Sequence, residues 1–268
     1  MPKTPREQPV PVFELEKMTF EEVDALPREH TIIILPMGPL EAHGPHLPLS
    51  VDMRGARVLT ELAAALLSEK GRTVAIAPAV SYTLAEASIP FPGTVSLSRE
   101  TVVGLTRDIA KSFALHGFKR LVINCHHLER PNLAALNEAA TSAREFGISV
   151  LVSNAILDSF SECGRLMKGE RPEWDIHAGE WETSLFLWRF PDEVRPAYRD
   201  LPPNWSNVRE KFSAGAKDFC EAGGQRCYFG DPAKGEAKTG EALYRIQARF
   251  LAAEIEEWMG QDDGAAFG

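Results

Sequence analysis

The amino-acid sequence predicts an α/β fold in three layers, in which helices cover both faces of a mostly parallel central sheet. Short segments rich in Val and Ile alternate with longer segments whose apolar residues recur at helical spacing. Strand–helix–strand crossovers are right-handed and place helices on both faces of a sheet. Clusters of ionisable residues follow two of the predicted strands, where sheets of this kind hold their active-site loops.

Four short segments are predicted to be strands because they are rich in β-branched residues: Thr31–Met37, Thr73–Ala77, Arg120–Asn124 and Ser149–Ser153. Four longer segments are predicted to be helices because their apolar residues have helical spacing: Arg54–Glu69, Arg99–Leu115, Asn132–Phe146 and Gly240–Met259. The alternation of the two kinds of segment favours a parallel sheet.

The chain is expected to form one domain over residues 1–268. Its hydrophobic content of 44% and charged content of 25% are ordinary for a globular protein, and its length allows a sizeable core. Residues 1–15 are interpreted as a Pro-rich extended arm. Residues 261–268, which contain Gly and Asp, are expected to fray.

The charge pattern argues against a nucleic-acid partner. The formal net charge is −9, and Lys and Arg form no cluster of the kind that phosphate binding needs. A small-molecule substrate is therefore expected. The apolar stretches fall far short of the roughly 20 residues that span a bilayer, and the N-terminus lacks the apolar core of a secretory signal. We expect no membrane span and a cytoplasmic location.

Two kinds of site are disfavoured by missing motifs. The cysteines lack the Cys-x-x-Cys spacing of zinc fingers and thioredoxins, so we expect thiols with structural or incidental roles. They are Cys125, Cys163, Cys220 and Cys227. A serine hydrolase is disfavoured because there is no Gly-x-Ser-x-Gly motif.

The densest cluster of ionisable residues lies between the first predicted strand and the first helix. Glu41, His43, His46 and Asp52 fall within this segment, which Pro and Gly keep from forming a regular helix. Carboxylate oxygens and imidazole nitrogens suit zinc, manganese or iron(II). Asp52, at the start of the next helix, could bridge two ions. The alternative is that Asp52 caps the helix and the histidines lie at the surface.

Two further clusters weigh against that alternative. The segment 124–129 follows a predicted strand, and the segment 175–184 places polar groups before an apolar helix. Five of the seven histidines lie in the three clusters together.

At this point the sequence resembles the creatininase family of metal-dependent amidohydrolases. The resemblance rests first on Glu41-x-His43-Gly44-x-His46-Leu47-Pro48 followed by Asp52. Other landmarks follow in the family's order, between about Ile32 and Leu251: Phe91-Pro92-Gly93-Thr94 with Ser96-Leu97-Ser98, His177-Ala178-Gly179 with Glu182-Thr183-Ser184, and Gly230-Asp231-Pro232.

The resemblance implies a creatininase-like α/β fold with two divalent metal ions, zinc, manganese or iron. The matching positions make five residues ligands, with the aspartate as the bridge: Glu41, His43, Asp52, His126 and Glu182. His177 would be the nearby acid or base, or a residue that supports the ligands. Members of the family commonly form hexamers, so a homo-oligomer is expected.

The sequence departs from the family in the segment that follows the predicted strand Arg120–Asn124. Many members have Asn-Gly-His-Gly-Gly-Asn, whereas here Asn124-Cys125-His126 is followed by five residues before Asn132. The longer loop changes the expected substrate more than the metal site, and His127 and Arg130 would suit an oxygen-rich substrate. Glu129 is a catalytic or additional ligand candidate, one position displaced from a glutamate that binds metal in creatininase. Alternatively, the Glu129 carboxylate forms an ion pair with Arg130 or contacts the substrate.

The leading function is the opening of a small polar cyclic amide by a dinuclear amidohydrolase. One alternative is hydrolysis of a carbon–carbon bond in a cyclic diketone, as in the inosose-derivative hydrolases that resemble this family. Another is a non-catalytic metal-dependent binding protein. Trp174 is expected to line the substrate pocket, and His46 to support the ligands or fix their loop.

Overall fold

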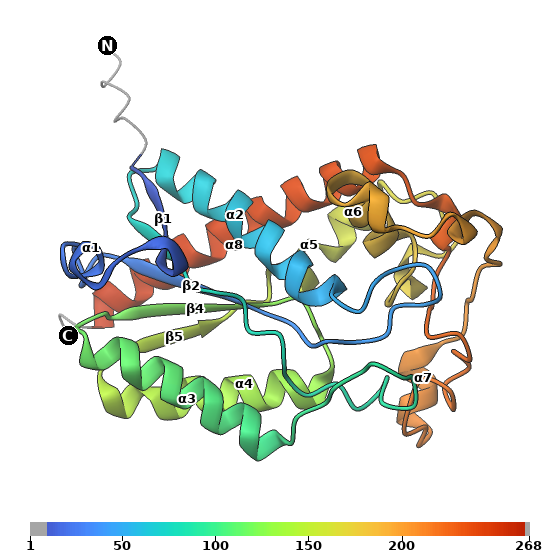
Figure 1. Cartoon of the computed structure of the whole chain (residues 1–268), viewed down its shortest axis with the longest axis horizontal. Helices are drawn as coiled ribbons and strands as arrows, with labels where there is room; N and C mark the ends of the chain where they lie inside the picture. The colour runs from blue at the N-terminus through green and yellow to red at the C-terminus, as the bar shows by residue number, and fades with distance from the viewer. Residues whose placement is uncertain (1–9, 266–268) are drawn as a thin grey trace, which may run out of the picture.

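The computed structural model of the protein describes residues 10–265. Its centre is a sheet of five parallel strands in the order β1-β3-β2-β4-β5. The strands are β1 (Val12–Glu14), β2 (Ile32–Met37), β3 (Val74–Ile76), β4 (Arg120–Cys125) and β5 (Ser149–Val152). The predicted α/β fold with a parallel central sheet is confirmed (Figure 1).

Helices cover both faces of the sheet, as Figure 1 shows. The α-helices are α1 (Phe20–Asp24), α2 (Val51–Glu69), α3 (Arg99–Leu115), α4 (Arg130–Ala143), α5 (Ala155–Gly164), α6 (Glu180–Arg189), α7 (Val208–Ser213) and α8 (Ala237–Ala265). Short 3₁₀ turns lie at Leu15–Lys17, Arg144–Phe146, Pro172–Trp174, Pro191–Glu193, Pro196–Asp200 and Pro232–Lys234.

The sheet separates two apolar cores. Successive side chains of a strand point to opposite faces, so Ile32 and Ile34 of β2 pack with α2 and α8, while Ile33 and Leu35 pack with α3 and α4. All four side chains are buried. The apolar run of β2 is therefore explained by burial on both faces, which is typical of parallel sheets.

Regular structure reaches into both the expected arm and the expected tail. Val12–Glu14, inside the predicted arm, forms the edge strand β1 and pairs with Val74–Ile76. Helix α8 continues through Ala265, inside the predicted frayed tail. Three residues of β1 are too short a run to give a strand signal, and an adjacent strand with free backbone groups decides their conformation. Residues 1–9 and 266–268 lie outside the described part.

The register of the central strands places the candidate site. Met37 of β2 pairs with Cys125 of β4, so the two strands end side by side at their carboxyl ends. The loops that follow them must therefore emerge at the same edge of the sheet. Helix α2 begins at Val51, three residues earlier than predicted, and this puts Asp52 in its first turn. Within the described residues, no helix is long and apolar enough to cross a membrane.

Candidate metal centre

The loop between β2 and α2 contains the first two candidate ligands, Glu41 and His43, and both are buried. The loop crosses the start of α2 closely, because a Cβ atom on Gly38 would lie 2.5 Å from the Cβ of Asp52. On its other side, Thr94 Oγ1 accepts a hydrogen bond of 3.0 Å from the backbone N–H of Ala42. The Pro-Gly-Thr segment around Thr94 therefore fixes the ligand loop in place.

His43 is oriented by its own loop. Its Nδ1–H donates to the carbonyl oxygen of Glu41 over 3.0 Å, because a carbonyl oxygen can only accept. The other ring nitrogen, Nε2, is then free of a proton in the neutral ring and points at two carboxylates. It lies 3.5 Å from Oδ2 of Asp52 and 3.7 Å from Oε2 of Glu182. A histidine held in one tautomer in this way is the usual form of a metal ligand.

Asp52 and Glu182 come from the first turns of α2 and α6. The positive end of a helix dipole favours a carboxylate there. Glu182 Oε2 also accepts a hydrogen bond of 2.5 Å from the backbone N–H of Ala178. Ala178 has a left-handed φ of 49°, an unusual conformation for a residue with a side chain, and it follows His177 directly. The chain is thus held in an uncommon shape where it enters the site.

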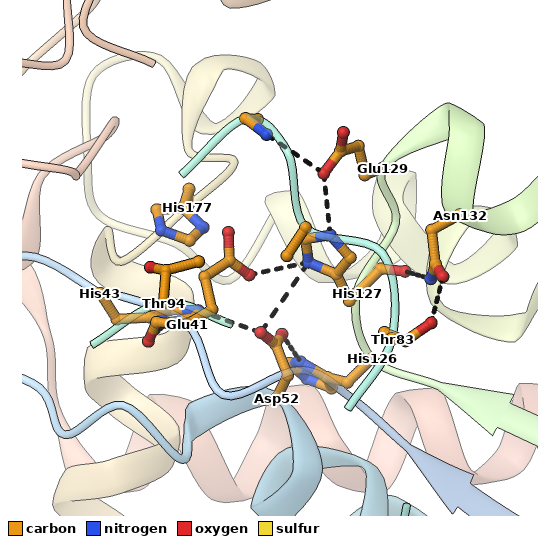
Figure 2. A network of polar contacts seen from close by, with 12 residues as sticks. Glu41, His43, Asp52, Thr83, Thr94, His126, His127, Glu129, Asn132 and His177 are labelled. Carbon is orange, nitrogen blue, oxygen red and sulfur yellow. Dashed lines mark hydrogen bonds and ion pairs between the residues drawn. The ribbon is translucent and has the colours of Figure 1, made fainter. Parts of the chain in front are cut away.

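The two neighbouring histidines after β4 point in opposite directions. The His126 N–H still donates to the carbonyl oxygen of Met37, so the backbone remains extended beyond the strand. In an extended chain, adjacent side chains lie on opposite sides. His127 Nδ1 lies 2.8 Å from Oε2 of Glu41 and 3.8 Å from Oδ2 of Asp52. His127, rather than His126, therefore faces the ligand loop (Figure 2).

Three groups of three side chains could hold a metal ion among the described residues. One contains Glu41, Asp52 and His127, and a second contains His43, Asp52 and Glu182. A third contains Glu41, His43 and His177. Asp52 belongs to the first two groups, which otherwise share no residue.

The chemistry of these side chains fits divalent metal ions. Oε1 of Glu41, Oδ2 of Asp52 and Nε2 of His43 are buried without a hydrogen bond. Buried polar atoms are normally paired, because an unpaired one costs about 1–3 kcal/mol. Three such atoms from the ligand loop and α2 could be paired by divalent cations. Oxygen and imidazole nitrogen without thiolate suit zinc, manganese and iron(II).

The site is strongly negative. Burial lowers the pKa of His43, but the carboxylates of Asp52 and Glu182 outweigh this effect and raise the pKa to about 10. Burial also lowers the pKa of His127, but Glu41 and Glu129 raise it by more than burial lowers it. The pKa of His127 therefore lies well above its usual value. The pKa of Glu182 is lowered to about 2 against its burial, chiefly by His43. Such a field attracts divalent cations.

The raised pKa of His43 predicts that metal binding competes with protons. At pH 7 the metal-free His43 is protonated, because its pKa is about 10, and an ion can bind its Nε2 only after that proton leaves. Affinity is therefore expected to rise with pH, by about tenfold per pH unit for each proton released. Competition with a coloured chelator at pH 6, 7 and 8 measures this. An affinity that does not change with pH would contradict the assignment.

His177 lies beside both groups of ligands. Its ring centroid is 4.1 Å from that of His43, and its Nε2–H donates to the carbonyl oxygen of Ala42 over 2.8 Å. Its Nδ1 therefore has the free lone pair. Burial, and then the nearby charge of His43, lower the pKa of His177 below its usual value. A neutral imidazole with one free nitrogen can accept a proton at neutral pH.

Three other predicted site residues, Glu129, Arg130 and Trp174, lie in different surroundings. Glu129 precedes α4 and lies 3.2 Å from Nε2 of His127 instead of forming the suggested pair with Arg130. Arg130 is exposed at the first position of α4. Trp174 lines an open pocket of about 350 Å³ together with Ile176 and Val208. The pocket adjoins the segment that leads to His177.

His126 differs most from its expected role. Its Nδ1 lies 3.4 Å from Oδ1 of Asp52 and 3.8 Å from Oε1 of Glu182. Its Nε2 forms a short hydrogen bond with the hydroxyl of Tyr244. None of the three candidate groups among the described residues includes His126. It remains close to the ligands, but its second ring nitrogen is already bonded to protein.

His46 has the supporting role that the sequence suggested. Its Nε2 is hydrogen-bonded to Oγ1 of Thr183 over 2.8 Å, which ties the ligand loop to α6. Burial, and then the nearby charge of His43, lower the pKa of His46 to about 4, so the ring is neutral. Sequence reasoning missed Tyr244 altogether, because a tyrosine among apolar residues at helical spacing gives no signal of a polar contact.

A model of the creatininase family, described as creatinine amidohydrolase, matches residues 16–255. The mycofactocin precursor peptide peptidase of Mycobacterium tuberculosis (strain CDC 1551 / Oshkosh) is 27% identical over 250 residues, which are 89% of this chain and 90% of the relative. The 3-dehydro-scyllo-inosose hydrolase of Thermotoga maritima is 29% identical over 192 residues, 69% of this chain and 58% of that protein.

The fold also matches solved structures. A crystal structure of creatinine amidohydrolase (creatininase) superposes with a TM-score of 0.73 at 24% identity. The match covers 91% of this chain and 96% of that one. At this identity the superposition establishes the fold alone.

Proposed function

Since this chain belongs to the creatininase family, we propose that it is a metal-dependent hydrolase that cleaves an amide bond. The observation that supports this most directly is the convergence of unpaired buried ligand atoms on Asp52, which two candidate groups share. Glu41 and His127 follow β2 and β4, whose paired ends lie side by side, and Asp52 and Glu182 lie in the first turns of α2 and α6.

We assign the ligands from the two groups that share the aspartate. Glu41, Asp52 and His127 would hold one ion, and His43, Asp52 and Glu182 would hold the other. His127 thus replaces His126 in the ligand set that the resemblance implied. Glu129, which lies 3.2 Å from the far nitrogen of His127, orients that ring.

Divalent ions held by these residues would lower the pKa of a water molecule and polarise the substrate carbonyl. The protein supplies the proton transfers. Nδ1 of His177 takes a proton from the attacking water and returns it to the leaving nitrogen, while its Nε2–H remains bonded to Ala42. Glu41 and Asp52 are buried, so bulk solvent has little access to this part of the site.

The exposure of the ligands limits the substrate. Glu41 is fully buried, whereas the side chains of Glu182 and Glu129 are 12% and 14% exposed. We place the approach of the reacting group on the side of Glu182 and Glu129, the more exposed of these carboxylates. Because the ligand side chains are largely buried, we infer a compact reacting group, such as a cyclic amide or the end of a peptide. Because one relative is a peptidase, we consider peptides as well as cyclic amides as substrates.

Hydrolysis of a carbon–carbon bond is a second candidate. It is favoured by the similarity to an inosose-derivative hydrolase. The same ligands and the same proton acceptor would serve a cyclic diketone, because water again attacks a polarised carbonyl.

Turnover by the purified protein tests this proposal. We expect hydrolysis in the presence of Mn²⁺ or Zn²⁺, loss of at least about 100-fold on removal of the metal by a chelator, and recovery on its return. The panel contains creatinine, a short unstructured peptide and a cyclic diketone of the inosose type, and product analysis identifies the bond that is cleaved. Bound metal without turnover of any of these would instead support a binding protein. A sedimentation measurement of the same sample checks the expected homo-oligomer.

A further inference from the structure

We infer that His126 and Tyr244 are positioning residues, which together hold the bridging carboxylate of Asp52 in the orientation that two ions require. This inference rests on the proposed function. It assigns to the first histidine of the His126-His127 pair a role different from that of the second, and it brings a residue of the last helix into the metal centre.

The direction of His126 follows from the strand before it. Side chains of β4 alternate, so that Val122 packs in the core with α2 and α8, while Leu121 and Ile123 pack in the core with α3 and α4. Asn124, on the same side as Val122, donates to the carbonyl oxygen of Ala56 in α2 over 2.9 Å. His126 is next on that side. Its side chain therefore points between α2 and α8, away from His127.

Helix α2 is shaped to receive the His126 ring. A Cβ atom on Gly55 would lie 2.8 Å from Nε2 of His126, closer than such atoms approach in practice. Glycine is otherwise unfavourable inside a helix. Its presence at position 55, one turn after Asp52, is explained by the space that the ring needs.

Hydrogen bonding fixes which nitrogen of His126 has the proton. The carboxylate of Asp52 can only accept, so Nδ1–H points toward Oδ1 over 3.4 Å. Nε2 then has a lone pair, and the hydroxyl of Tyr244 donates to it. Tyr244 is fully buried, and burial raises the pKa of its hydroxyl well above the usual value, so it remains a donor.

The resulting chain runs from Tyr244 through His126 to Oδ1 of Asp52 (the last of these contacts is drawn in Figure 2). It leaves Oδ2 of Asp52, which has no hydrogen bond, facing His43 and His127. A carboxylate fixed in this way has its orientation set before metal binds. Such outer partners typically contribute about 10- to 100-fold to metal affinity or activity.

The test measures metal affinity and stoichiometry in the whole protein for His126→Ala, His126→Gln and Tyr244→Phe. We expect each variant to bind two ions at saturating Mn²⁺ or Zn²⁺, with affinity lowered by about 10- to 100-fold. His126→Gln is expected to recover part of the loss, because its amide can still donate to Asp52. The double variant of His126→Ala and Tyr244→Phe is expected to lose no more affinity than His126→Ala alone, since the two act in series.

Matched controls separate this role from a general loss of stability. Tyr228→Phe also removes a tyrosine hydroxyl with a protein partner, the carbonyl oxygen of Pro202 at 2.7 Å, and it should leave metal affinity unchanged. Gly55→Ala displaces the His126 ring without altering it and should reproduce the loss of affinity. Thermal unfolding of each variant with and without metal identifies any variant that does not fold.

Three results would overturn the inference. Loss of one ion from His126→Ala at saturating metal would make His126 a ligand. Unchanged affinity in folded His126→Ala would leave it without a role at the metal. Full additivity of the two substitutions would separate Tyr244 from His126. If the unaltered protein binds no metal at any concentration, the proposed function fails, and this outcome is distinct from the other three.

Discussion

Asp52→Asn is expected to produce a folded protein that retains neither ion and has no measurable turnover. Asp52 belongs to both ligand groups, and its Oδ2 lies near His43 and His127 at the same time. Asparagine has nearly the same shape but no charge, so two cations would lose the anion that lies between them. Changes to outer partners of metal ligands already cost about 10- to 100-fold, and the loss of a shared ligand should exceed this.

The Asp52→Asn experiment needs a control for the helix, because Asp52 also lies in the first turn of α2. Asp158 is an exposed acidic residue in the first turn of α5, and Asp158→Asn is the matched control. Metal content is measured by elemental analysis after gel filtration, together with thermal unfolding. If Asp52→Asn retains two ions per chain, Asp52 does not bridge them.

His177→Ala is expected to slow turnover by about 100- to 10,000-fold, the usual contribution of a positioned acid or base, while metal content stays at two ions. The reason is geometric. Nε2 of His177 is bonded to Ala42 and its ring centroid lies 4.1 Å from that of His43, yet His177 is in neither of the two groups that share Asp52.

The His177→Ala experiment compares kcat, KM and the pH profile with those of the unaltered protein. Loss of the limb of the profile that requires a neutral base would support the assignment. His116→Ala, which changes an exposed histidine at the end of α3, is the control. Loss of an ion from His177→Ala would place His177 in the third candidate group, with Glu41 and His43, and make it a ligand.

The order of strands and helices was readable from the sequence because it is a local property. Burial of a strand on both faces requires an apolar run, and this requirement is visible at Ile32–Leu35 whatever else the chain does. The segment Val12–Glu14 was not recognised as a strand, since its conformation depends on pairing with β3, about 60 residues away.

The candidate site was readable to the same extent. The family resemblance implied Glu41, His43, Asp52 and Glu182 as ligands, and the structure places all four in candidate groups. Sequence analysis took His126 as the ligand, whereas in the structure it is His127 that faces Glu41. Counting along β4 would have helped, since Asn124 and His126 must share one side of the strand, but which side faces the ligand loop is not a local property.

What the sequence determined by itself is therefore the type of fold, the edge of the sheet that bears the site, and most of the side chains that gather there. Each of these follows from spacing within a few residues, because backbone geometry sets which neighbours share a face. The tertiary structure alone decided that His127 faces Glu41, and that Tyr244 meets a histidine 118 positions away. Contacts between distant elements depend on how helices pack across the sheet, and no local pattern encodes that packing.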